Sequence, residues 1–331
     1  MAIMSRLAEA ARPDRDMRMV TRPDESSRRP LMSAGDLALL LWLAAATPLS
    51  LLPGAARWRL CRLLARPAMY GARAAGARRA VGRMAGFGED EAARIVHSLY
   101  AGRLVAQVDL LRGLLVGPDL RLDCQGLQEL DAALARGRGA VLWISDFVGA
   151  GEATKIALAK AGYRASHLSR PEHGFSKSRF GIRAINPIRV RFELRYLKER
   201  VVYDRGQPQE AIRRLAQRLA ENGVVSLTAS AHEGRQVTEG RLLAGRLRLA
   251  VGAPKLALMT GAPLIPVHAI RDPEEPGRFE IIFDPALTLS RKLPKGEAIL
   301  AATRDYLDRL EIQLLRRPEA WGGWRRLGNL A

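Results

Sequence analysis

The chain has 331 residues, of which 48% are hydrophobic, so it suits one large α/β domain or two small ones with ample material for a buried core. The formal net charge of +19 predicts an anionic partner, and nucleic acid is disfavoured because only 5% of residues are aromatic and no recognition motif occurs. Two cysteines exclude a zinc ribbon and a disulfide framework, and no His/Cys/Asp spacing indicates a metal site.

The first 56 residues are predicted to form an arm followed by a membrane anchor. Residues 1–34 are polar and Arg-rich, which is typical of disorder. The anchor helix is expected at 35–56, around the uncharged run 37–52, which falls short of the roughly 20 apolar residues of a full span. Arginines crowd the next turns, with Trp42 and Trp58 nearby, as at a cytoplasmic membrane face. A tilted span, an interfacial helix and a buried core helix all fit this run.

Residues 57–331 are predicted to form a single α/β domain. A helix with one apolar face is expected at 89–115. Short apolar runs then alternate with amphipathic ones. Strands are expected at 140–144, 163–168, 200–203, 224–228, 264–269 and 279–283, and helices at 127–135, 153–161, 209–221, 247–260 and 304–317. This alternation predicts a mixed, largely parallel sheet flanked by helices, preceded by the apolar anchor helix and a helical hairpin.

An acidic residue stands where the first buried strand of this sheet is expected to end. Asp146 follows the run 140–144, and sites in open α/β sheets form at the carboxyl ends of strands. Aspartate is also a preferred N-cap residue, so a cap for the helix that contains Glu152 is the structural alternative. Ser145 lacks the flanking glycines of a nucleophile elbow.

The segment 126–152, GLQELDAALARGRGAVLWISDFVGAGE, resembles the bacterial late acyltransferases of lipid A biosynthesis, within the lysophospholipid-acyltransferase superfamily. In that family a similar helix and Gly-x-Gly turn lead into an apolar strand. Further segments match in the family's order: 169–171 (SRP), 178–181 (SRFG), 244–246 (AGR), 260–267 (TGAPLIPV) and 317–326 (RPEAWGGWRR). The resemblance covers about residues 35–331, and the apolar helix lies where the family has its anchor.

This resemblance implies a membrane-associated acyltransferase at the cytoplasmic face of a bacterial inner membrane. It would move a fatty acyl chain from a thioester to a hydroxyl or amine of a lipid or glycolipid, of the lipid A type or a related envelope lipid. The thioester, on an acyl carrier protein or coenzyme A, is a donor substrate, so no bound cofactor is expected. The basic surface would gather anionic membrane lipids and an acidic carrier protein.

The chain departs from the family at the catalytic element, which is a His, four residues, then Asp or Glu. Asp146 stands in the place of the His, and Glu152 follows one residue late. A solvated aspartate is a poor general base, although burial beside a second carboxylate raises a pKa. Three interpretations stay open. Asp146 and Glu152 form a tuned pair, another residue is the base, or the chain is a non-catalytic lipid-binding member of the same fold that takes part in envelope lipid assembly.

Other candidate site residues follow the later strands. His232 is the alternative base, and Glu233, Gly234 and Arg235 beside it resemble the Glu-Gly-x-Arg phosphate-binding block of broader glycerolipid acyltransferases. Guanidinium groups bind phosphate at two points, so phosphate or headgroup contacts are expected from Arg170, Arg235 and Arg246. His167 and His173 are further candidates for the base, because they lie near a strand end and in the loop after it. His268 lies within a strand and is expected to be structural.

Overall fold

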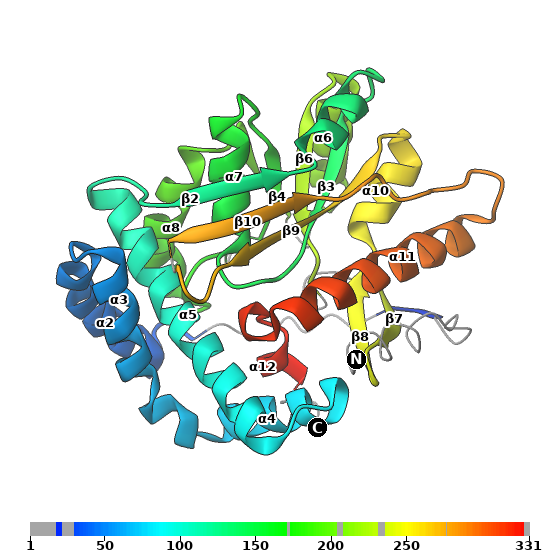
Figure 1. Cartoon of the computed structure of the whole chain (residues 1–331). Coiled ribbons are helices and arrows are strands. Elements are labelled where there is room, and N and C mark those ends of the chain that lie inside the picture. The colour runs from blue at the N-terminus through cyan, green and yellow to red at the C-terminus, as the bar shows by residue number, and fades with distance from the viewer. Residues whose placement is uncertain are drawn as a thin grey trace.

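A mixed sheet with the strand order β2-β10-β9-β3-β6-β4-β5 forms the centre of the protein (Figure 1). The computed structural model describes residues 18–21, 30–170, 173–203, 208–230, 236–275 and 277–327, and within these the sheet has seven strands. They are β2 (Arg121–Gln125), β3 (Ala140–Ile144), β4 (Ser166–Ser169), β5 (Glu199–Val202), β6 (Val224–Thr228), β9 (Leu264–Arg271) and β10 (Arg278–Phe283). The run from β9 to β5 is parallel, and β10 and β2 run the other way. The predicted fold class is therefore confirmed for the sheet.

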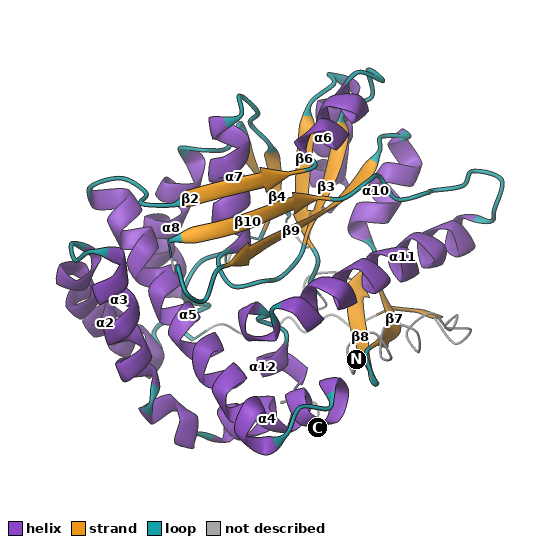
Figure 2. Cartoon of the chain, viewed as in Figure 1, coloured by secondary structure: helices purple, strands orange, loops and turns teal. Residues whose placement is uncertain are grey.

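Helices cover both faces of this sheet (Figure 2). The helix α7 (Ala150–Lys160) packs on β2, β3, β9 and β10. On the other face, as right-handed crossovers require, α9 (Pro208–Ala220) packs on β4 to β6 and touches α10 (Gly252–Thr260), which packs on β3. The long helix α11 (Lys295–Arg316) adjoins α10 and β9, and the short α6 (Leu127–Leu134) lies against β3 and β10. The central strand β3 is fully buried between these layers, because all five of its residues are apolar.

The N-terminal helices gather at one end of the sheet, coloured blue to cyan in Figure 1. They are α2 (Ala34–Ser50), α3 (Gly54–Ala65), the short η1 (Pro67–Tyr70), α4 (Ala72–Ala85) and α5 (Glu89–Leu115). Leu43 and Ala46 of α2 are buried in a small apolar cluster with α5, whereas Leu37 and Leu41 are 55% and 64% exposed. In the part of the chain that the structure describes, no helix combines the length and apolarity needed to cross a bilayer. The anchor helix predicted at 35–56 is therefore not confirmed.

A second, antiparallel sheet joins β1 (Arg18–Thr21), β7 (Gln236–Leu242) and β8 (Gly245–Ala250). The first of these strands falls within the predicted arm 1–34, of which residues 1–17 and 22–29 lie outside the described residues. The helix predicted at 247–260 is wrong in its first part. Residues 245–250 alternate between cross-strand ion pairs and buried leucines, which is the period of a strand.

The remaining short elements close the structure around the carboxyl ends of the parallel strands. After β4 come η2 (Gly181–Ile185) and α8 (Asn186–Leu194), which packs on α5. After α11 come η3 (Pro318–Ala320), which also lies on α5, and α12 (Trp324–Leu327), which packs on α4. Thus α8 and the C-terminal segment bring side chains to the sheet edge where Asp146 was expected to face a site.

Candidate active site

A cleft of about 540 Å³ opens at the carboxyl ends of β3, β4 and β6. Its other walls are α5, the first turn of α7, the segment that follows β4, and Arg189 of α8. Asp146, Glu152 and Arg170 all line it, so the structure brings together three residues that the sequence singled out. Leu39, Leu110 and Phe175 supply apolar surface in the same cleft.

Asp146 is tied to the C-terminal segment of the chain. Its carboxylate forms an ion pair with Arg326 of α12, and its backbone carbonyl accepts a hydrogen bond of 3.1 Å from the N–H of Gly322. The carboxylate does not cap α7, because the N-cap is Gly149, whose φ of +81° suits glycine. A carboxylate held by a guanidinium favours its ionised form, which makes it a weak proton acceptor.

Glu152 lies in the first turn of α7 and has an arginine partner of its own. Arg189 of α8 forms an ion pair with its carboxylate. Burial and the nearby Glu193 oppose ionisation, but Arg189 and Lys155 outweigh them, so the pKa of Glu152 lies below its usual value. The two carboxylates thus share one cleft, and each is paired with a different arginine.

Behind Glu152 lies a buried charge cluster centred on Glu193 of α8, a residue that the sequence analysis did not single out. The Glu193 carboxylate is 0% exposed and lies 3.0 Å from Lys155 Nζ, 2.9 Å from Arg189 Nε and 2.7 Å from His173 Nε2. Although burial opposes ionisation, Lys155, His173 and Arg189 together hold the pKa of Glu193 well below its usual range. The carboxylate is therefore ionised, and it fixes the positions of the groups around it.

His167 also borders the cleft, but its ring is buried. The imidazole Nδ1 lies 2.9 Å from Ser226 Oγ of the neighbouring strand. Burial, with a contribution from Lys155, holds the pKa of His167 well below its usual range, so the ring is neutral and a weak base.

A second buried histidine belongs to a network beneath the end of β3. Ser145 Oγ lies 2.6 Å from His268 Nδ1 and 2.8 Å from Tyr306 OH, and His268 Nε2 lies 3.1 Å from an oxygen of Asp284. The composition is that of a Ser-His-Asp triad, but Ser145 is 1% exposed and shares its hydroxyl with the tyrosine. We assign this network a structural role that joins β3, β9 and α11, as expected for His268.

Arginines that the sequence analysis missed stand at one end of the cleft. Arg103 of α5 and Arg326 line it, and Arg325 lies near enough to repel the charge of Arg103. Burial, and then the like charges of Arg325 and Arg326, lower the pKa of Arg103 to about 10. A bound anion would offset the burial and the nearby positive charges, and so would stabilise the charged guanidinium. The sequence carried little signal, because Arg103 is one of three arginines of α5 and nothing in the pattern sets it apart.

The other predicted phosphate ligands do not join this cleft in the described part of the chain. Arg246 lies on β8 in the small sheet, with its Nε 3.0 Å from Glu239 Oε1, and it does not line the cleft. The segment 231–235, with His232, Glu233, Gly234 and Arg235, lies outside the described residues.

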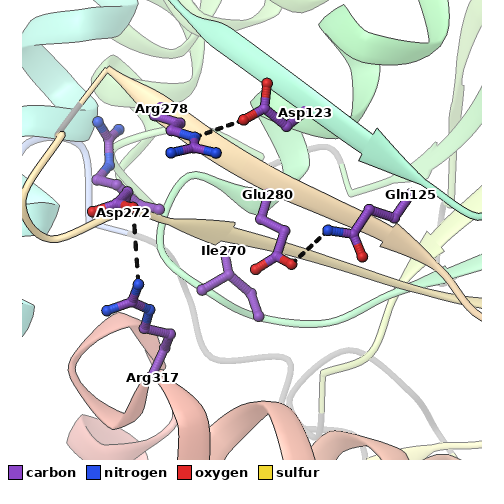
Figure 3. Close-up of a pocket in the computed structure, with 8 residues that line it drawn as sticks. Asp123, Gln125, Ile270, Asp272, Arg278, Glu280 and Arg317 are labelled. Atoms are coloured by element: carbon purple, nitrogen blue, oxygen red, sulfur yellow. Dashed lines mark hydrogen bonds and ion pairs between the residues drawn. The ribbon is translucent and has the colours of Figure 1, made fainter.

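A smaller hollow of about 220 Å³ lies over β2, β9 and β10 (Figure 3). Arg278 reaches Asp123 at 2.6 Å, Gln125 donates to Glu280 at 2.8 Å, and Arg317 approaches Asp272 at 3.8 Å. These charges balance one another, so the hollow suits neither an acyl chain nor an anion. Among the described residues, no group of three or more His, Cys, Asp or Glu side chains is placed to hold a metal ion.

Comparison with known proteins identifies a family for this chain. A family model described as bacterial lipid A biosynthesis acyltransferase matches residues 37–324, most of the chain. A search of curated proteins finds no significant match. The family match confirms the resemblance that the sequence motifs indicated.

Proposed function

The chain belongs to the bacterial lipid A biosynthesis acyltransferase family, and from that membership we propose that it transfers a fatty acyl chain from an acyl thioester to a lipid A-type acceptor. The donor is an acyl carrier protein or coenzyme A thioester, and the acceptor offers a hydroxyl or an amine. The reaction takes place at the cytoplasmic face of a bacterial inner membrane.

The observation that carries this proposal is the mixed chemistry of the large cleft. Its volume of about 540 Å³ falls in the range of small-molecule sites, roughly 300–1,000 Å³. Leu39, Leu110 and Phe175 suit an acyl chain, while charged groups that follow β4 or lie on α7 and α8 suit a polar headgroup. A site that transfers an apolar acyl chain to a polar acceptor needs both apolar and charged surfaces.

The cations of the cleft support a phosphorylated acceptor. Arg103, Arg170, Lys177 and Arg326 line it, and the half-buried position of Arg103 near two other arginines makes an anionic ligand favourable there. Arginine matches the oxygens of a phosphate at two points, which also orients the acceptor.

The N-terminal helices support membrane association of an interfacial kind. Leu37, Leu41, Leu51, Leu63 and Leu64 of this region are each at least 46% exposed, and α3 and α4 also carry exposed arginines. An apolar surface edged with arginines binds in the headgroup region of anionic bilayers. Because Leu39 of α2 also lines the cleft, the same helix links this surface to the site.

One observation favours a second candidate, a non-catalytic lipid-binding protein of envelope lipid assembly. Asp146 stands where the family has its catalytic His, and its ion pair with Arg326 leaves it poorly suited to accept a proton. A binding protein would keep the cleft and its cations and would lack turnover.

The experiment that separates the two candidates is acyl transfer by the purified protein in mixed micelles. The acceptor is a phosphorylated glucosamine disaccharide lipid with a free hydroxyl, and the donor is a radiolabelled acyl carrier protein or coenzyme A thioester. We expect an acylated product, and we expect Arg103→Gln to raise the KM for the acceptor about tenfold or more, the cost of one charge-assisted hydrogen bond.

The matched control is Arg213→Gln, because Arg213 is exposed on α9, outside the N-terminal helices, and does not line the cleft. Binding of the acceptor without turnover by either donor would contradict the transferase and favour the lipid-binding candidate. Equal KM values for Arg103→Gln and Arg213→Gln would contradict the phosphate contact alone.

A further inference from the structure

We propose that His173, held in place by Glu193, is the general base of the transfer. The inference rests on the proposed function and deepens it, because it names the group that takes the proton of the acceptor. The observation behind it is a histidine–carboxylate pair in the wall of the cleft, on residues outside the family's usual catalytic element.

The geometry leaves one ring nitrogen of His173 ready to accept a proton. Nε2 lies 2.7 Å from an oxygen of Glu193. An ionised carboxylate only accepts hydrogen bonds, so Nε2 carries the hydrogen and Nδ1 carries the free lone pair. Within the described residues Nδ1 has no hydrogen-bond partner, and the side chain is 22% exposed. The residue lines the cleft, which places the free nitrogen where an acceptor hydroxyl can reach it.

The support behind His173 is rigid. Lys155 of α7 binds one oxygen of Glu193, and Arg189 of α8 shares the other oxygen with the imidazole. From β4, which precedes this segment, the ring of His167 meets that of His173 edge to face, at 6.5 Å between centroids. Buried partners of this kind hold a catalytic ring in one orientation, as a carboxylate does for the histidine of a hydrolase triad.

The two carboxylates of the cleft are weaker candidates for the same role. Asp146 is paired with Arg326 and Glu152 with Arg189, and the pKa of Glu152 lies below its usual value. Proton transfer from an alcohol to such a carboxylate costs more free energy than transfer to an imidazole, because the carboxylate is the weaker base. The efficiency of a general base follows its basicity.

The other described histidines are also unsuited. His97 lies on α5 away from the cleft, with its Nε2 2.9 Å from the carbonyl of Arg62. His167 is buried with a weakly basic ring, and His268 is sealed in the network beneath β3. His173 is thus the one described histidine that combines exposure to the cleft with a carboxylate partner.

The step balances with the proposed substrates alone. Nδ1 of His173 takes the proton of the acceptor hydroxyl as its oxygen attacks the thioester carbonyl carbon. A C–O bond forms and the C–S bond breaks. The thiolate leaves and recovers the proton from the imidazolium, so the products are an ester and a free thiol and the histidine is regenerated.

The test compares His173→Gln with His97→Gln in the transfer assay, with folding checked by circular dichroism. We expect kcat to fall by about 10²–10⁴-fold in His173→Gln, the usual contribution of a general base, with the donor KM little changed. The His97→Gln variant should match the wild type.

A chemical probe covers the case in which His173→Gln does not fold. Diethyl pyrocarbonate applied to the folded His97→Gln protein should abolish transfer as His173 is modified, and hydroxylamine should restore it. Wild-type rates with His173 substituted or carbethoxylated would overturn the base assignment and leave the proposed function standing. Absence of transfer by the wild-type protein would overturn both.

Discussion

Substitution of Glu193 by Gln should strongly destabilise the fold, because it leaves the buried cation Lys155 without its carboxylate partner. The carboxylate is 0% exposed and Lys155 is 3% exposed, with 3.0 Å between Nζ and the oxygen. In the variant, Lys155 loses its only ion-pair partner among the described residues. Breaking a buried pair by removing one charge costs about 3–5 kcal/mol, a large fraction of a typical stability of about 5–15 kcal/mol.

The loss of stability in Glu193→Gln should be greatest near neutral pH and should decrease in acid. The pKa of Glu193 is depressed in the folded protein from an ordinary value of 4.5, so its contribution is present above about pH 4.5 and disappears as pH falls through the folded pKa. The difference in unfolding free energy between wild type and Glu193→Gln should therefore be largest near neutral pH and shrink steadily below pH 4.5.

Urea unfolding followed by circular dichroism at several pH values measures both effects. The control is Glu221→Gln, since Glu221 is 40% exposed and pairs with Arg218 at the surface, where such pairs contribute about 0–1 kcal/mol. A cost for Glu193→Gln no larger than that of the control, or a difference that grows on acidification, would refute the buried-cation argument.

Three further predictions concern other parts of the fold. Ser145→Ala should cost about 1–3 kcal/mol, because its two buried partners lose their hydrogen bond, and transfer should persist; loss of transfer in the folded variant would instead make Ser145 a nucleophile. Gly113→Ala should lower the melting temperature, because the new Cβ would lie 2.3 Å from a ring carbon of Phe192, and an unchanged melt would contradict that packing. Burial raises the pKa of Cys61 to about 12, so maleimide should label Cys124 once in the native protein, as mass spectrometry can count, and a native double label would count against a buried Cys61.

Much of the central sheet follows from local pattern. Residues 140–144 and 224–228 were predicted as strands with the bounds of β3 and β6, since a short apolar run between turn residues is the pattern of a buried parallel strand. The helix at 89–115 likewise matches α5. Strands with many polar residues were harder. The polar strands β2 and β7 were missed, and the leucines of β8 were assigned to a helix, because their arginine neighbours hid the two-residue period.

In the site too, the sequence determined some features and the tertiary structure determined the others. A side chain that directly follows a buried parallel strand must lie at the carboxyl edge of the sheet, so the sequence by itself placed Asp146 at the cleft, and its motifs identified the family. Only the tertiary structure paired Asp146 with Arg326 and His173 with Glu193. These partners come from α12 and α8, and which charges meet depends on how those helices dock. Local periodicity records whether a residue is buried, whereas the identity of its neighbour is a property of the assembled layers.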